Sequence, residues 1–144
     1  MKRAQPSGAW RFGCVALALA LGAVSCKNSD STTTPPSATT KTESFSGTVA
    51  VAGSDSHSFT VANAGKVDVT LTAAGPPATI NMGVAIGTPG DNACNVLQGA
   101  STNTQAGSSP QLSGKVSPGT LCVQVYDNGN QTAPVTYTVT VAHP

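Results

Sequence analysis

The sequence offers few residues that could carry out acid–base chemistry. Its two histidines are His57 and His143, and His57 stands two residues after Asp55, between Ser56 and Ser58. Serine, histidine and aspartate make up a nucleophilic triad, but neighbours on a strand point to opposite faces, and a triad depends on convergent geometry. His143 is the penultimate residue, where order is usually poor. We therefore expect no catalytic site, no enzymatic activity and no cofactor.

Oxygen-bearing side chains in expected turns are the candidates for a metal site. Carboxylate and amide oxygens are ligands that calcium takes, and the candidates are Asp55, Asp91, Asp127, Asn128 and Asn130. One end of a sandwich could bring the three aspartates together. The alternative, which we favour, is that the asparagines and their neighbours supply left-handed turn conformations between strands. Zinc would need three or four converging ligands, so we expect no bound metal.

The N-terminal segment, residues 1–25, has the pattern of a signal peptide. Lys2, Arg3 and Arg11 precede an apolar run from Phe12 to Val24, and no acidic residue lies before or within the run. The run is shorter than the roughly 20 residues that a membrane-spanning helix needs. It therefore predicts export rather than a permanent transmembrane anchor.

The residues Ala23-Val24-Ser25-Cys26 follow this apolar run. They are similar to the lipobox of a bacterial lipoprotein signal, which implies cleavage before Cys26 and acylation of that cysteine. Two or more acyl chains give a stable membrane anchor. Lys27 stands where an aspartate would resemble an inner-membrane retention signal, so we expect an exported, outer-membrane lipoprotein of the cell envelope. The alternative is ordinary secretion, with Cys26 left as a free thiol.

The charge of the mature chain excludes one class of partner. After Ser25 the sequence has four lysines, six acidic residues and no arginine, which gives a net charge of −2. Nucleic-acid backbones are bound by clusters of lysine and arginine, so we expect no nucleic-acid partner. The expected partners are the membrane, through the lipid anchor, and a surface glycan or protein; the oligomeric state stays open.

The mature chain divides into a linker and one domain. Residues 26–42 carry the cysteine and a segment rich in Ser, Thr and Pro without a large apolar residue, which predicts a disordered linker. Residues 43–144 instead alternate apolar and small polar side chains, for example from Val67 to Ala73 and from Tyr137 to Val141. This alternation, interrupted by turn residues, predicts an all-β domain of seven or eight strands in an antiparallel sandwich.

Two cysteines of the domain, Cys94 and Cys122, are expected to form a disulfide, because an exported domain folds where disulfides are permitted. The alternation places Cys122 on the face opposite Leu121 and Val123. The bridge would therefore lie on an outer face or at a sheet edge, and it would stabilise the fold by about 3 to 4 kcal/mol. Two buried thiols are the alternative.

Two stretches of the domain combine glycine turns with alternating strands: FSGTVAVAGSDSHSFTVANAGKVDVTLTA and GTLCVQVYDNGNQTAPVTYTVTVAHP. In the first, the turn Gly53-Ser54-Asp55 opens a strand that ends in Phe59. In the second, Pro118-Gly119-Thr120 opens a strand of alternating aliphatic residues. This pattern resembles the bacterial pre-peptidase C-terminal domain. The resemblance implies a jelly-roll-like sandwich that serves secreted proteins as an accessory or adhesive module, sometimes with calcium, and is not a catalyst.

The expected function is that of a non-enzymatic, lipid-anchored module of the cell surface or periplasm with a structural, adhesive or accessory role. The second hypothesis is a carbohydrate- or protein-binding module, with or without calcium, and the third is a hydrolase. A binding groove would present an exposed aromatic side chain, and Tyr126, beside the Asp127 turn, is the candidate. We favour the alternative that Tyr126 packs beside the last hairpin.

Overall fold

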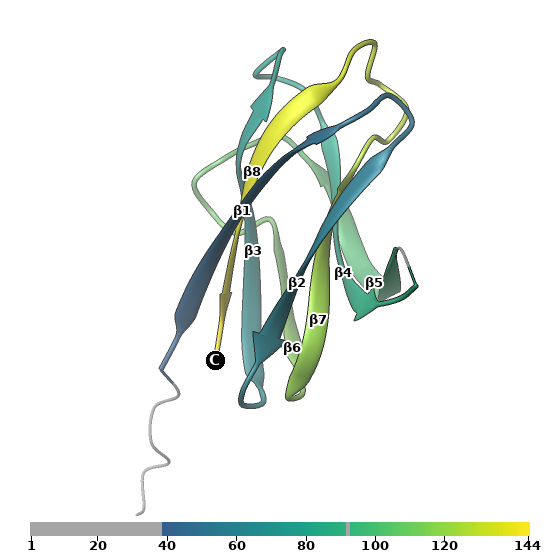
Figure 1. The fold of residues 1–144 in the computed structure, drawn as a ribbon. Coiled ribbons are helices and arrows are strands. Elements are labelled where there is room, and N and C mark those ends of the chain that lie inside the picture. The colour runs from purple at the N-terminus through teal and green to yellow at the C-terminus, as the bar shows by residue number, and fades with distance from the viewer. Residues whose placement is uncertain (1–38, 92) are drawn as a thin grey trace, which may run out of the picture. The chain divides into compact units, whose positions relative to one another are not determined.

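The computed structural model describes residues 39–91 and 93–144. Figure 1 shows their eight strands: β1 (Lys41–Val49), β2 (Ser54–Val61), β3 (Gly65–Gly75), β4 (Met82–Pro89), β5 (Cys94–Thr104), β6 (Leu112–Val116), β7 (Gly119–Tyr126) and β8 (Val135–His143). The first strand begins at Lys41, two residues before the predicted domain start. In these ranges no helix is long and apolar enough to cross a membrane. The predicted signal peptide and Cys26 lie outside the described residues.

The strands form two four-stranded antiparallel sheets that pack face to face (Figure 1). The first sheet has the order β1-β8-β3-β6 and the second the order β2-β7-β4-β5. The chain changes sheet at almost every connection, and only β4 and β5 are consecutive strands of one sheet. The predicted all-β sandwich is confirmed, with eight strands.

The core lies between the sheets because alternate residues of each strand point inward. On β3, for example, Val67, Val69 and Leu71 are fully buried. Each such side chain stabilises the fold by about 1.5 to 3 kcal/mol relative to an exposed one. The neighbouring strands add Met82, Val84, Val123, Val125, Val139 and Val141.

The Cys94–Cys122 disulfide joins β5 to β7, with the two Cα atoms 5.8 Å apart. The bridge passes over β4, which lies between these strands, next to Gly87. A Cβ atom at Gly87 would come within 2.8 Å of the Cys94 Sγ atom, so the missing side chain makes room for the bridge. Both cysteines are buried but lie outside the core cluster. The predicted disulfide and its position on an outer face are confirmed.

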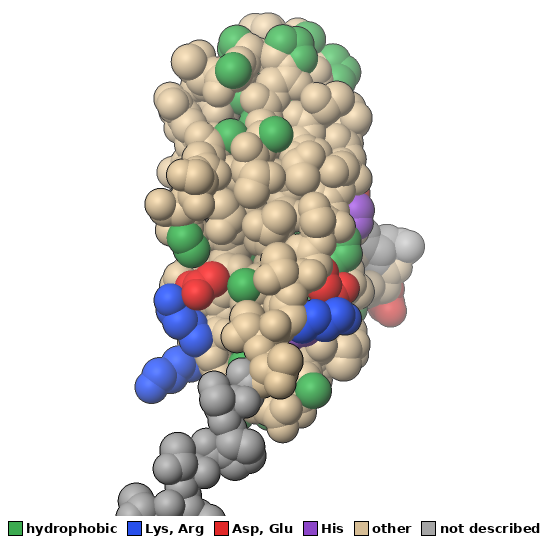
Figure 2. All heavy atoms as spheres, turned by 90° about the vertical axis from the view of Figure 1, so that its left-hand side faces the viewer, with side chains coloured by type: hydrophobic (Ala, Val, Ile, Leu, Met, Phe, Trp, Pro, Cys, Tyr) green, Lys and Arg blue, Asp and Glu red, His purple; other side chains and the backbone are tan. Residues whose placement is uncertain are grey.

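The outer face of the first sheet carries mostly short hydroxyl side chains. On β1 and β8 these are Thr42, Ser44, Ser46, Thr48, Thr136, Thr138 and Thr140, and the strand register pairs all of them except Thr42 across the two strands. Figure 2 shows this side of the domain, with lysine and acidic side chains confined to its lower part. The upper part therefore shows no lysine or acidic side chain, and a few hydrophobic side chains lie among its polar atoms.

The edge strands of the two sheets meet along two lines. Strands β1 and β2 are neighbours on one side of the sandwich, and β5 and β6 are neighbours on the other. We call these lines the β1–β2 seam and the β5–β6 seam. The side chains that fill them differ, and both seams enter the functional argument below.

Candidate functional site

Tyr126 lies on the outer face of the second sheet, at the end of β7. Its neighbour Val125 points into the core, so the strand alternation turns Tyr126 outward. The register places Tyr126 opposite Gly83 of β4, and a Cβ atom built on Gly83 would overlap the tyrosine ring. The ring therefore lies flat against the β4 backbone. It packs on β4 rather than beside the last hairpin, and it is only partly buried.

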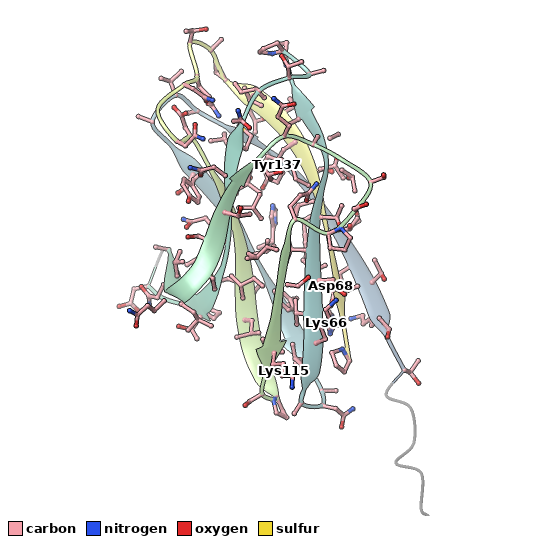
Figure 3. All side chains as sticks on the ribbon, turned by 180° about the vertical axis from the view of Figure 1, so that it is seen from behind. Lys66, Asp68, Lys115 and Tyr137 are labelled. Atoms are coloured by element: carbon pink, nitrogen blue, oxygen red, sulfur yellow. A yellow bond between two sulfur atoms is a disulfide. The ribbon has the colours of Figure 1, made fainter. Side chains whose placement is uncertain are left out.

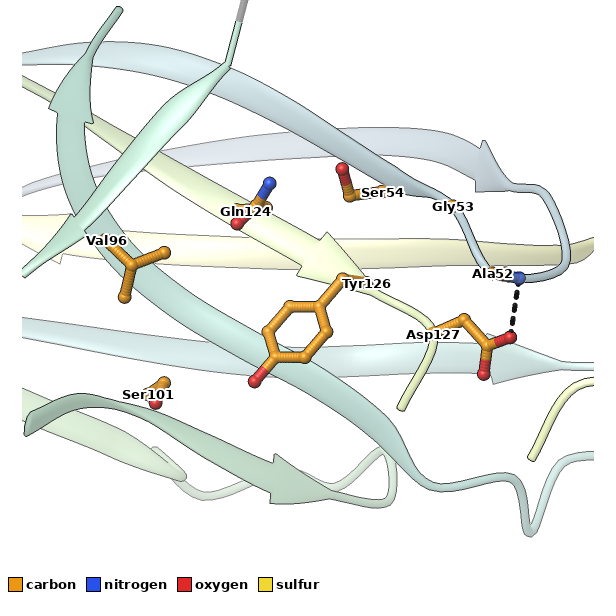
Figure 4. A pocket seen from close by; sticks show the side chains of 8 residues that line it. All are labelled: Ala52, Gly53, Ser54, Val96, Ser101, Gln124, Tyr126 and Asp127. Atoms are coloured by element: carbon orange, nitrogen blue, oxygen red, sulfur yellow. Dashed lines mark hydrogen bonds between the residues drawn. The ribbon is translucent and has the colours of Figure 1, made fainter. Parts of the chain in front are cut away.

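A shallow groove of about 410 Å³ surrounds this ring (Figure 4). Its uncharged polar lining comes from Ser54 of β2, Gln124 of β7 and Ser101 of β5. Its apolar lining comes from Val96, which is 43% exposed. An aromatic face, an aliphatic side chain, two hydroxyls and an amide together suit a ligand that has both apolar surface and hydroxyl groups.

Asp127 also borders the groove, but its carboxylate is already engaged. Its Oδ2 atom accepts a hydrogen bond of 2.8 Å from the Ala52 N–H. Its Oδ1 atom accepts from the N–H groups of Gly129, Asn130 and Gln131. The Ala52 contact above all, and then the other N–H groups, hold the pKa of Asp127 below its usual range. Asp127 thus fastens the β1–β2 turn to the β7–β8 loop.

The other calcium candidates do not gather around Asp127. Asp91 follows β4, and the antiparallel register with β7 places it at the opposite end of the sheet. Asp55 points between the sheets, while Asn128 and Asn130 belong to the loop that Asp127 organises. The structure therefore does not bring the three aspartates together at one end of the sandwich. Among residues 39–91 and 93–144, no group of three or more His, Cys, Asp or Glu could hold a metal ion.

The β1–β2 seam holds a cluster of hydrogen-bonded side chains that the sequence reasoning missed. The Tyr137 hydroxyl donates to the Asp55 Oδ2 atom over 2.8 Å and lies 2.8 Å from the His57 Nε2 atom. The Phe45 ring stacks on the His57 ring with centroids 5.0 Å apart. Gly47 leaves room, because a Cβ atom there would overlap the Asp55 carboxylate. Burial, and then the nearby Asp55 carboxylate, raise the pKa of Tyr137.

A second pair closes the same seam nearer the start of β1. The His143 Nε2 atom lies 3.0 Å from the Glu43 Oε1 atom, which also accepts from the Lys41 ammonium over 2.9 Å. The Lys41 contact, followed by the His143 contact, lowers the pKa of Glu43. His143 is only 1% exposed, so the expectation of poor order at this position is wrong. It also packs against Phe59, with ring centroids 5.3 Å apart.

The serine candidates do not complete a triad with these groups. Ser56 and Ser58 are exposed on the outer face of β2, whereas Asp55 and His57 point between the sheets. The His57 Nε2 atom is bound to a tyrosine hydroxyl and not to a serine. The cluster therefore ties the sheets together, and the sequence-predicted residues that border the open groove are Tyr126 and Asp127.

Comparison with models of known protein families gives no match for this chain, and comparison with curated proteins gives none either. The geometry establishes an all-β, two-sheet sandwich with one disulfide, and the disulfide points to a compartment outside the cytoplasm.

Proposed function

We propose that this protein is an exported, lipid-anchored adhesion module of the cell envelope, without enzymatic activity, that binds neutral glycans in the groove beside Tyr126. Acylated Cys26 is its anchor, in the outer membrane, and the Ser/Thr/Pro segment that follows is its linker. The resemblance to pre-peptidase C-terminal domains supports an accessory or adhesive role. The single observation that carries the glycan proposal is the tyrosine ring held flat against Gly83 in an open groove.

The chemistry of the groove favours a neutral ligand. Sugar rings present C–H faces that pack against aromatic rings and hydroxyls that pair with amides and alcohols. Ser54, Ser101 and Gln124 offer such partners around the ring. The carboxylate that borders the groove already accepts four backbone N–H groups, so it has little capacity left for a cation. An anionic glycan would find no cationic side chain in the lining.

Retention on insoluble neutral polysaccharides, such as cellulose, chitin and β-glucan, tests the groove. We expect Tyr126→Ala to weaken binding by at least about tenfold, as loss of an aromatic contact at the centre of a site does. Tyr126→Phe keeps the ring and should retain most of the affinity. Tyr137→Phe is the matched control, because it removes a tyrosine hydroxyl that lies between the sheets and is not part of the groove lining. If Tyr126→Ala left retention unchanged, the binding surface would lie outside the groove. If the wild type were retained on no neutral polysaccharide, the glycan proposal would be contradicted.

Mass spectrometry of the mature protein tests the anchor separately. We expect a diacylglycerol adduct on Cys26, and we expect Cys26→Ser to release an unacylated protein from membranes. An unmodified, soluble mature form of the wild-type protein would contradict the lipid anchor without bearing on the groove.

A further inference from the structure

The β5–β6 seam contains an open apolar slot of about 260 Å³. Its apolar lining comes from Ile86, Leu97, Ala100, Leu112 and Val116. Leu97 is 41% exposed, because residues 97–100 leave the ladder with β4 and carry this side chain over the seam. An exposed leucine that borders an unfilled apolar slot offers surface that a partner could bury.

Strand β6 offers a free backbone edge beside this slot. It has five residues, Leu112–Val116, and its only strand partner in the described part of the chain is β3. The N–H and C=O groups on its other side can therefore pair with an added strand. Gly114 of β6 faces the seam, and no atom lies within 4 Å of where its Cβ atom would stand. The seam thus has room for the side chains of a further strand.

Positive charge borders the same edge. Lys66 of β3 and Lys115 of β6 stand directly opposite one another on the outer face, as Figure 3 shows from behind. Like charges in such cross-strand positions destabilise a sheet. Lys66 has a partner, because its Nζ atom lies 2.8 Å from the Asp68 Oδ1 atom, which also accepts from Ser113. Lys115 makes no ion pair with any described residue. An acidic group on a partner would relieve this repulsion.

These features discriminate between three candidate ligands of the seam: the chain's own linker, a second copy of the chain and a segment of another protein. The chain's own linker, residues 27–40, has no large apolar side chain to fill the slot. A second copy paired through β6 would bring Lys115 of both copies to one short edge, where they would repel. We propose that the β5–β6 seam binds an extended, acidic peptide segment of another envelope protein. The segment adds to β6 as a fifth strand, places alternate apolar side chains in the slot and presents carboxylates to Lys66 and Lys115.

Titration with a labelled, blocked peptide of about seven alternating glutamate and valine residues tests this proposal by fluorescence anisotropy and NMR. We expect binding that shifts the amide resonances of β5 and β6 and leaves those of β1 and β2 unchanged. The corresponding lysine–valine peptide should bind at least about tenfold more weakly. Absence of binding by the glutamate–valine peptide at millimolar concentration would overturn the proposal, as would equal binding of the two peptides.

Two variants test whether the peptide binds at the β5–β6 seam. Gly114→Val adds a branched side chain at the slot, where its Cβ atom would meet no atom within 4 Å, and should abolish peptide binding while the melting temperature stays close to that of the wild type. Lys66→Glu combined with Lys115→Glu should reverse the preference, so that the lysine–valine peptide binds more tightly. Lys41→Glu is the matched charge reversal on β1 and should change neither affinity. Peptide binding that survives Gly114→Val, or a wild-type dimer that Gly114→Val dissociates, would contradict the proposal.

Discussion

The β1–β2 seam and the β5–β6 seam differ in how the edge strands are held where the two sheets meet. In the first, the Phe45 ring stacks on the His57 ring and His57 hydrogen-bonds to the Tyr137 hydroxyl, so side chains from both sheets close the gap. In the second, apolar side chains leave a slot, and edge strand β5 is attached to its sheet by the Cys94–Cys122 disulfide. The difference shows that an edge strand can be held in place in two ways. Side chains can fill the space between the sheets, or a disulfide can join the edge strand to another strand of its own sheet.

The two seams also differ in what they can accept. Acidic side chains point inward from both edge strands of the closed seam, Glu43 from β1 and Asp55 from β2. Inward-pointing charges on edge strands are a means by which sheets resist the addition of another strand. At the open seam the charged residue that borders the slot, Lys115, points to the outer face. The open seam can therefore receive a strand, provided that the strand carries the opposite charge.

Removal of the disulfide should have the largest effect on this comparison. The bridged cysteines are 28 residues apart, which corresponds to about 3 to 4 kcal/mol of stabilisation in the chain-entropy account. We expect the Cys94→Ala, Cys122→Ala double variant to lose about this free energy of unfolding, measured by urea titration. Amide exchange should accelerate most in β5 and least in β1. Equal acceleration in both strands would show that the open seam does not depend on the covalent bond.

A matched pair of apolar truncations compares the seams directly. Phe45→Ala removes a ring that stacks on His57 at the closed seam, and we expect it to cost about 2 kcal/mol, below the range for fully buried aromatics. Leu97→Ala removes an exposed side chain from the open seam and should change stability by less than about 0.5 kcal/mol. Urea unfolding of both variants gives the comparison. A loss in Leu97→Ala as large as that in Phe45→Ala would mean that the open seam is already packed.

The sequence alternation predicted the fold but not what the closed seam contains. The face of Cys122 followed from the apolar residues beside it, and the structure confirms that face. The same rule places Asp55 and His57 on the inward face with Phe59 and Val61, which are buried. The sequence favours a turn position for Asp55, because aspartate is common in turns, whereas strand parity directs its side chain inward. Tyr137, the partner of Asp55 and His57, comes from β8, and local sequence patterns do not reveal which distant strands lie next to one another.

Strand order and register account for the remaining differences. The separation of Asp91 from Asp127 follows from the antiparallel pairing of β4 with β7, which composition and spacing do not reveal. The packing of Tyr126 depends on the register that places Gly83 opposite it. Turn residues mark where strands end, but they do not tell which ends lie together.

High pH should weaken the closed seam through Tyr137. An unfolded tyrosine ionises near pH 10, and burial beside Asp55 raises the pKa of Tyr137 in the folded domain. The stabilisation from the neutral hydroxyl is therefore complete below about pH 10 and decreases as the pH rises further, by at most about 1.4 kcal/mol per pH unit. Urea unfolding from about pH 8 to about pH 11 measures this slope. Tyr137→Phe should lose this component, while Tyr126→Phe should keep it.

Asp127→Asn should have a small effect, at the turn that closes one end of the β1–β2 seam. The carboxylate accepts the Ala52 N–H and three N–H groups of the β7–β8 loop, and an amide is a weaker acceptor whose own N–H groups face these donors. We expect a melting temperature a few degrees lower at neutral pH. Because the folded-state pKa of Asp127 is depressed, the wild type gains this stabilisation above the unfolded value of about 3.9 and loses it as the pH falls through the lower, folded-state value. The melting temperatures of Asp127→Asn and the wild type should accordingly converge below about pH 4. Calcium at millimolar concentration should raise neither melting temperature, because the carboxylate oxygens that would bind the ion already accept backbone N–H groups. If calcium raised the melting temperature of the wild type and Asp127→Asn abolished that rise, the loop would have to open to bind the ion.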